Sequence, residues 1–434
     1  MSVALAIAVL FGVFFLLLFA GIPISVSIAI SSMMTALFFL SWEQSTFVVM
    51  QSMNLGTESF SLLAVPLFIF AGNIMNNGGI ARRLIDLAQV LAGRIPGSLA
   101  HTNVLGNMLF GSLSGSAVAA AAAVGGTLHQ RQKDEGYDPA FSTAVNIASA
   151  PTGLLIPPTA AVIVYSTIAG GVSISALFMA GYGPGILMGL AVMATAFLYA
   201  RKHSYSVSGR TSARLALQIL LRAIPSLLLI VVVVGGIVFG VFTATEGAGV
   251  AVLYTLLLAL AYRSMSWADF RQVMIRTVST TGVVMFLIAA SSAMSWVMAY
   301  TGIPGAISSA VLSISDTRFV IFLLMLVVLL VVGTFLDITP AILIFTPIFL
   351  PVVTELGMDP VHFGIVLILA MCIGTMTPPV GSVLFVSCGV SGVTIEQVAP
   401  RLIPYFVVLI LVLLAVTYLP ALSLGLPQVL GLLE

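Results

Sequence analysis

Residues 148–159 read ASAPTGLLIPPT and lie halfway along an apolar stretch that extends from 139 to 168. Proline removes a backbone donor and clashes with the preceding helical turn. Three prolines and a glycine within eight residues are therefore expected to unwind a helix at this point. Residues 374–382, GTMTPPVGS, interrupt a second apolar stretch, 361–388, in the same way. The sequence predicts two broken helices, each with freed backbone carbonyl groups.

The composition is that of a protein embedded in a lipid bilayer. Of the 434 residues, 60% are hydrophobic and 7% are charged, and the mean hydropathy is +1.21, whereas about a quarter of the residues of a soluble domain are charged. A membrane β-barrel would alternate apolar and polar residues, but runs such as 227–234, LLLIVVVV, are continuous. We therefore expect an all-α, polytopic membrane protein. Its net charge of +1 offers no basic arm for nucleic acid.

The apolar runs predict about ten transmembrane helices and two helical hairpins. Each hairpin has a polar, glycine-rich tip, GSLSGS at 111–116 and GTFLDITP at 333–340, and is expected to re-enter on its own side of the membrane. The hairpins are expected at 99–128 and 318–355, and the crossings at 3–20, 24–41, 61–77, 139–168, 174–200, 223–242, 245–263, 277–299, 361–388 and 402–424.

Positive charge predicts the orientation, because cytoplasmic loops are enriched in Lys and Arg. No Lys or Arg precedes Arg82, so the loop at 42–60 is expected outside, as are the loops at 301–317 and 355–360 and both termini. The basic loops are expected inside: Arg82, Arg83 and Arg94; Arg131 and Lys133; Arg201, Lys202, Arg210, Arg214 and Arg222; Arg263, Arg271 and Arg276.

The chain matches itself at an offset of 221 residues. The offset pairs Asp138-Pro139 with Asp359-Pro360, Gly153 with Gly374, Pro157-Pro158 with Pro378-Pro379, and Ser116 with Asp337. This predicts a first repeat over 1–200, a basic cytoplasmic connector over 201–222 and a second repeat over 223–434. Each repeat has an odd number of crossings, so the two are expected to be inverted. Inverted repeats with broken helices at the midplane are typical of secondary transporters.

The tips and the breaks contain the residues most suited to transport. Unwound backbone at membrane depth is tolerated only where it is buried or lines a cavity, and its carbonyl oxygens are hard ligands that suit Na⁺. Asp337 is the one acid well inside the second hairpin, and an ionisable group at that depth is a functional candidate by default. A single Ser or Gly here can equally serve helix packing. Asn103 and Asn107 either face substrate or bond between helices, and Glu246 is more simply a helix cap than an ion ligand.

At these residues the chain resembles the large membrane subunit (the DctM-like M subunit) of the tripartite ATP-independent periplasmic, or TRAP, transporters. The resemblance covers essentially the whole length. It is carried by residues 72–75 (GNIM) with 78–80 (GGI), 111–119, 146–159, 242–247 and 374–381.

The resemblance implies a Na⁺-coupled importer of an organic acid in the bacterial inner membrane, with elevator-type movement and no enzymatic activity. The substrate classes are C4-dicarboxylates, sialic acid and other sugar or keto acids. It also implies a periplasmic substrate-binding protein and a small four-helix membrane subunit. Because 434 residues leave no room for four more helices, that subunit is expected to be a separate chain.

The resemblance further implies two Na⁺ sites and a substrate site. The first Na⁺ site would use Ser112, Ser114, Gly115 and Ser116 with Ser149, Pro151, Thr152 and Gly153. The second would use Gly333, Thr334 and Asp337 with Gly374, Thr375 and Met376. Without an Arg clearly at the midplane, substrate is expected to rely on backbone amides, the Na⁺ charge and the polar side chains of Asn107, Thr159, Thr377 and Ser382.

Three other functions are weighed against this one. A membrane-embedded enzyme would need paired acids, a buried base or a metal set, which the sequence does not offer. A channel would not need inverted broken helices. A stand-alone Na⁺/dicarboxylate-type symporter is the nearest competitor, and neighbouring genes for a small membrane subunit and a binding protein would distinguish the two.

Overall fold

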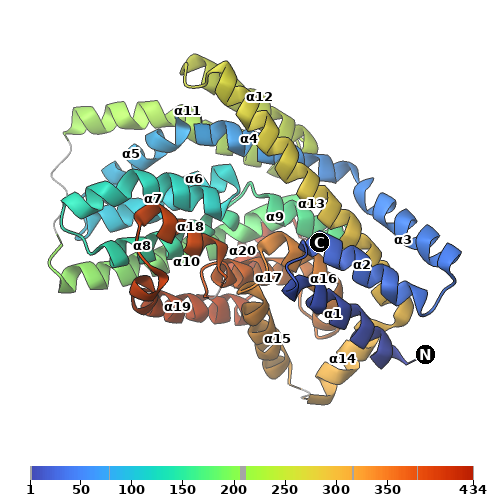
Figure 1. The fold of residues 1–434 in the computed structure, drawn as a ribbon. Coiled ribbons are helices and arrows are strands. Elements are labelled where there is room, and N and C mark those ends of the chain that lie inside the picture. Colours follow the sequence, from blue (N-terminus) through green and yellow to red (C-terminus); the bar gives the residue numbers. More distant parts are fainter. Residues whose placement is uncertain (1, 78, 206–211, 315–316, 379, 434) are drawn as a thin grey trace.

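Every regular element in the described part of the chain is a helix (Figure 1). The computed structural model describes all residues except 1, 78, 206–211, 315–316, 379 and 434. Part of the predicted connector, 206–211, and Pro379 of the second break therefore lie outside the described residues.

The first half contains ten α-helices and two 3-10 helices: α1 (Val3–Phe19), α2 (Ile24–Leu37), α3 (Trp42–Thr57), η1 (Phe60–Leu63), α4 (Ala64–Asn77), α5 (Ile80–Ala92), α6 (Ser98–Ser114), α7 (Ala117–Asp134), α8 (Pro139–Ser149), η2 (Ala150–Leu154), α9 (Ala160–Ile168) and α10 (Ile174–Lys202). The second half contains α11 (Ala213–Val238), α12 (Ala244–Ala261), α13 (Trp267–Thr301), α14 (Ile303–Ile314), α15 (Arg318–Gly333), α16 (Ile338–Glu355), α17 (Pro360–Gly374), α18 (Ser382–Ser391), α19 (Ile395–Tyr418) and α20 (Ala421–Val429).

Several of these helices are long and apolar enough to cross a membrane. Among the described residues, six pass on their own, namely α10, α11, α12, α13, α16 and α19. A seventh is counted if α3 and the η1–α4 segment, bent by 62° at their junction, form one span. The chain is thus a multi-pass helical membrane protein. The count of ten crossings stays a prediction, because it treats each broken helix as one span.

Three segments expected as loops are helices. Most of the expected loop at 42–60 forms α3 (Trp42–Thr57), residues 80–92 form α5 and residues 303–314 form α14. The charge pattern predicts the side of the membrane on which a segment lies, but it carries no information on helicity. The missed signals are local: Ser41 and Gln44 form a capping box before α3. In α5, buried Ile80, Leu84 and Leu87 recur at helical spacing.

Both apolar stretches are divided into separate helices at the points where their prolines predict a break. The first runs from α8 through η2 to α9, and the second runs from α17 to α18. Each predicted hairpin consists of two helices and a short tip, α6–α7 around Gly115-Ser116 and α15–α16 around Thr334–Asp337. Whether the hairpins re-enter on one side of a bilayer stays a prediction.

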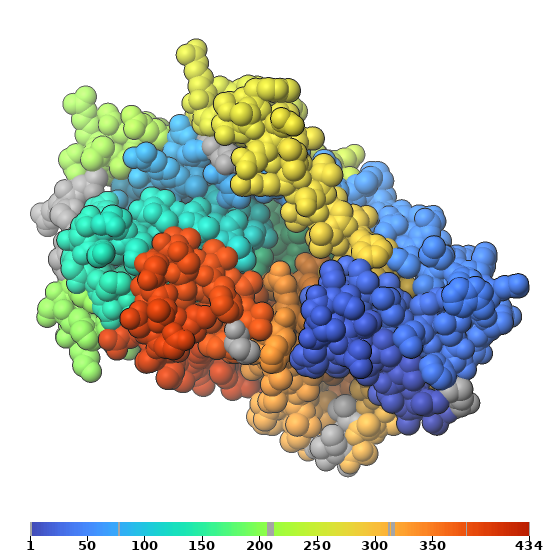
Figure 2. Space-filling model, viewed as in Figure 1, coloured from blue at the N-terminus to red at the C-terminus, as the bar shows by residue number. Residues whose placement is uncertain are grey.

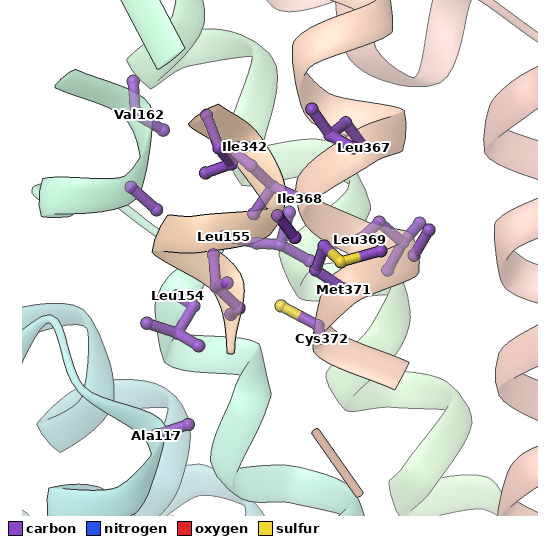
Figure 3. Packing of buried hydrophobic residues seen from close by; sticks show 14 of the residues in the cluster. Ala117, Leu154, Leu155, Val162, Ile342, Leu367, Ile368, Leu369, Met371 and Cys372 are labelled. Atoms are coloured by element: carbon purple, nitrogen blue, oxygen red, sulfur yellow. The ribbon is translucent and has the colours of Figure 1, made fainter. Parts of the chain in front are cut away.

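The two halves pack against each other through equivalent elements. Helix α7 packs on α18 and α16 packs on α9, α4 packs on α12 and α2 on α13, and α8 packs on α19 and α10 on α17. Figure 3 shows Leu154 and Leu155, beside the first break, meeting Ile342 of α16 and Ile368 and Met371 of α17 in one buried core. This reciprocal packing connects both hairpins and both breaks across the two halves, while the repeat itself stays a prediction.

Close backbone contact between tip and break occurs once in each half. A Cβ atom added to Gly111 of α6 would lie 2.8 Å from Cα of Gly153 in η2. A Cβ atom added to Gly374 at the end of α17 would lie 2.5 Å from Cα of Gly333 at the end of α15. Small residues let helix backbones approach in membranes. Both contacts therefore require glycine for its missing side chain.

We expect Gly374→Ala to lower the free energy of unfolding by about 1–3 kcal/mol, because the added methyl group overpacks a backbone contact. The matched control is Gly389→Ala in α18, where nothing lies within 4 Å of an added Cβ. Thermal unfolding of the purified variants measures both. Equal melting temperatures for the two variants would contradict the contact.

Candidate functional site

A cavity of about 300 Å³ lies between the two hairpin tips. The first tip contributes Ser114, Gly115 and Ser116, and the second contributes Asp337 and Thr339. Its other walls come from α4, α13 and the start of α9: Val65, Phe68, Ile69, Asn73, Asn76, Thr280, Val284, Pro158, Ala160 and Val164, with Leu113 and Ala119 of the first hairpin. The two predicted repeats thus meet at one site.

The electrostatics of this cavity depend on one carboxylate and two helix ends. Asp337 is the one ionisable residue among those that line it. Its Oδ1 accepts a hydrogen bond from the backbone N–H of Ile338 at 3.0 Å, so it caps α16. Ser116, its partner at the offset of 221, caps α7 by accepting from the N–H of Ala119 at 3.2 Å. Both helices therefore begin at the cavity, and the positive ends of their dipoles favour an anion there.

The residues expected to form the first Na⁺ site are brought together in part. Ser112 N would lie 2.8 Å from a Cβ added to Gly153, so the hairpin backbone touches the break. Buried Ser149 donates from Oγ to Val145 O at 2.7 Å, and Thr152 donates from Oγ1 to Ser149 O at 2.6 Å. The carbonyl of Pro151 accepts from Cys372 Sγ at 3.5 Å. Ser114, Gly115 and Ser116 lie at the cavity.

The second expected Na⁺ site has the same arrangement. Gly333 contacts Gly374 backbone to backbone. Thr334 donates from Oγ1 to Val331 O at 2.7 Å, and Thr375 donates to Cys372 O at 2.8 Å. Met376 is buried. Asp337 faces the cavity. Whether the carbonyl oxygens next to each glycine contact bind Na⁺ stays a prediction.

The comparison with known proteins decides the family. Residues 11–422 match the family described as "Tripartite ATP-independent periplasmic transporter, DctM component". The chain belongs to the DctM family of TRAP transporter large permeases. It is 51% identical over 421 residues to the Salmonella typhimurium protein "Uncharacterized protein YgiK", covering 97% of each chain. It is 39% identical over 377 residues to the C4-dicarboxylate TRAP transporter large permease protein DctM of Pseudomonas aeruginosa, covering 87% of this chain and 88% of that protein.

The fold is also that of a solved transporter. The crystal structure of the Alcanivorax borkumensis YdaH transporter superposes with a TM-score of 0.59 at 15% sequence identity, covering 90% of this chain and 89% of that one. At that identity the likeness concerns the fold alone. The DctM-family chain is therefore a helical membrane permease, and a permease is not an enzyme in the usual sense.

In this DctM-family chain, the four residues expected to bind substrate lie outside the lining of the cavity. Buried Asn107 joins α6 to α8 through its Nδ2, which lies 2.9 Å from Asn103 Oδ1, 3.0 Å from Asn146 Oδ1 and 2.8 Å from Ser149 Oγ. This geometry fits the second of the two expectations for Asn107, that its side chain forms hydrogen bonds between helices. Thr159 is fully buried between two lining residues, Thr377 donates to Ile373 O at 2.7 Å, and Ser382 begins α18. Their contact with substrate stays a prediction.

Sequence reasoning missed the polar wall that α4 and α13 contribute. Asn73 and Asn76 are three residues apart on α4, and Thr277 and Thr280 have the same spacing on α13. Asn73 Nδ2 donates to Thr277 Oγ1 at 3.0 Å, which links the two helices beside the cavity. Polar residues at this spacing inside an apolar span share one helix face. This spacing of polar residues in the sequence could have identified the polar wall.

Cysteine labelling tests which residues face the cavity. We expect Asp337→Cys to react with a hydrophilic maleimide, because this position lines the cavity, and Thr159→Cys to resist it, because the side chain is fully buried. The native chain, whose Cys372 and Cys388 are buried, sets the background. Equal labelling at both positions would contradict the described cavity wall.

Proposed function

We propose that this chain is the Na⁺-coupled large permease of a tripartite importer for an organic acid. The family includes curated large permeases for C4-dicarboxylate and for sialic acid. Substrate would bind in the cavity between the hairpin tips, delivered from outside by a periplasmic substrate-binding protein. A small four-helix membrane subunit on a separate chain would complete the complex in the bacterial inner membrane.

The observation that carries this proposal is the charge balance of the cavity. Its lining residues include the Asp337 carboxylate and no Lys or Arg. An organic anion entering beside a carboxylate is repelled by its charge. The two helix N-termini, capped by Ser116 and Asp337, offset part of that repulsion. Bound Na⁺ would offset the remainder, so ion and substrate would each raise the affinity for the other.

The breaks offer ligands for that cation. Each tip lies against a break through a glycine pair, so backbone from two segments meets where the helices are interrupted. Hydroxyl groups of Ser112, Ser149 and Thr375 lie in the same segments. Carbonyl and hydroxyl oxygens are ligands that hard cations prefer. A Na⁺ ion held there would stand beside the substrate and would also hold tip and break together.

The same packing supports the proposal of an elevator-type movement. Helices α7 and α16 each pack on a broken helix of the opposite half, through α18 and α9. The hairpins and breaks would therefore move as one body with the substrate. Helices α2, α4, α12 and α13 pack on one another and would form the stationary part. A stand-alone symporter is not favoured, because the family match is to the component of a tripartite system.

The function is tested by uptake of labelled organic acids into proteoliposomes that contain this chain and its small membrane subunit. Uptake should require both the binding protein and an inward Na⁺ gradient. Uptake without the binding protein would instead establish a stand-alone symporter, and uptake indifferent to Na⁺ would refute the ion coupling.

Within that assay we expect Asp337→Asn to lower Na⁺-driven uptake roughly tenfold or more, since a contact to a charged group contributes about 1.5–3 kcal/mol. The half-saturating Na⁺ concentration should rise as well. Glu246→Gln is the matched control, because Glu246 caps α12 by accepting from Thr243 N at 2.8 Å, away from the cavity. Unchanged Na⁺ dependence in a folded Asp337→Asn protein would remove Asp337 from the ion site.

A further inference from the structure

A second and larger cavity, of about 680 Å³, lies where α5, α11 and the end of α12 meet. It gathers residues from three segments that are far apart in the sequence: Arg82, Arg83 and Asp86 of α5, Arg222 of α11, and Tyr262 after α12. Figure 2 shows this end of the molecule, where the light blue of α4 and α5 lies between the light green of α11 and the yellow of α12. These segments carry the positive charge that predicts the cytoplasmic side.

The three arginines of this cavity have no acidic partner within salt-bridge distance. The two ion pairs found in the described part of the chain involve Arg131 and Arg401, so Arg82, Arg83 and Arg222 keep their charge uncompensated by direct contact. Asp86 is the single carboxylate in the lining. Three guanidinium groups against one carboxylate leave the cavity with an excess of positive charge.

The side chain of Tyr262 also belongs to the cavity wall. The hydroxyl oxygen of Tyr262 is buried and has no hydrogen-bond partner among the described residues. The guanidinium of Arg83 is held over the Tyr262 ring, with Cζ 3.4 Å from the ring centroid, and donates from Nη1 to Gly79 O at 3.3 Å. Gly79, which precedes α5, provides no side-chain cap. The α5 N-terminus therefore adds its own positive field to the arginines.

This excess of positive charge suits an oxyanion such as a phosphate group. Guanidinium groups bind phosphate oxygens through paired hydrogen bonds. Burial raises the pKa of the Asp86 carboxyl, and the charges of Arg82, Arg131 and Arg222 oppose that rise.

The neighbouring surface identifies the source of the phosphate. The cavity wall continues with apolar Ile219, Leu221 and Pro225. Beyond it α11 leaves Leu217, Leu220 and Ile224 exposed by 56%, 41% and 37%. A soluble phosphate has no apolar group that could pack on these exposed side chains. A lipid has both an anionic headgroup and acyl chains. Basic pockets between membrane helices on the cytoplasmic side bind anionic headgroups in this way.

We propose that this cavity is a binding site for an anionic phospholipid, with its phosphodiester between Arg82, Arg83 and Arg222 and its acyl chains along α11. The lipid would join α5 of the first half to α11 and α12 of the second. It would stabilise the junction between the halves without taking part in substrate binding. The site therefore stands apart from the cavity at the hairpin tips.

The test uses the full chain purified in an uncharged detergent, with thermal unfolding followed during titration with phosphatidylglycerol, phosphatidylcholine or inorganic phosphate. Phosphatidylglycerol alone should raise the melting temperature. Native mass spectrometry should show phosphatidylglycerol retained on the protein. Stabilisation by inorganic phosphate to the same extent would overturn the lipid assignment in favour of a soluble anion. Equal stabilisation by phosphatidylcholine would overturn the role of headgroup charge.

Two variants with opposite expected effects keep the test independent of folding defects. Arg222→Ala should weaken phosphatidylglycerol binding about fivefold, the factor that corresponds to the roughly 1 kcal/mol each interfacial cation contributes. Asp86→Asn removes the carboxylate and should strengthen binding by about the same factor. Arg276→Ala on α13 is the control, because this exposed arginine does not line the cavity, and should bind as the native chain does. A loss at Arg276→Ala equal to that at Arg222→Ala, or no gain at Asp86→Asn, would overturn the proposal.

Discussion

The structure depends on the constraint that backbone polar groups at membrane depth must be buried or must line a cavity. Two helices of this chain are broken by prolines, and each break would expose its carbonyl groups without a neighbour. The hairpins provide that neighbour. Gly111 lies on Gly153 and Gly333 lies on Gly374, so each break is covered by backbone at a distance that no side chain would permit. The site, the packing of the hairpins and the proposed ion ligands all follow from these two contacts.

The same contacts bear on how the proposed anion site could work without an arginine. The hairpin tips bring two helix N-termini, capped by Ser116 and Asp337, to one cavity. Helix ends supply a positive field that is fixed in the backbone, while Asp337 supplies a negative charge that only a cation can balance. In the proposed function, this geometry would favour binding of an anion together with a cation.

Arg82, Arg83 and Arg222 line a different cavity, at the junction of α5, α11 and α12. There they meet an apolar helix surface and the uncapped start of α5. On the two proposals made above, the cavities would divide the chemistry of anion recognition. One would hold a substrate through helix ends and ions, and the other would hold a lipid through guanidinium groups.

The membrane class, the two breaks and the helix–tip–helix stretches could be read from the sequence, because proline, glycine and long apolar runs act on the chain within a few residues of where they stand. The capping of α12 by Glu246 was equally local. What only the tertiary structure decided was which polar side chains share a cavity. Asn107 joins a buried amide network and lies away from the cavity, whereas Asn73 and Asn76, which sequence reasoning passed over, line it. That outcome depends on which helix of one half packs against which helix of the other, and no local pattern encodes a partner more than two hundred residues away.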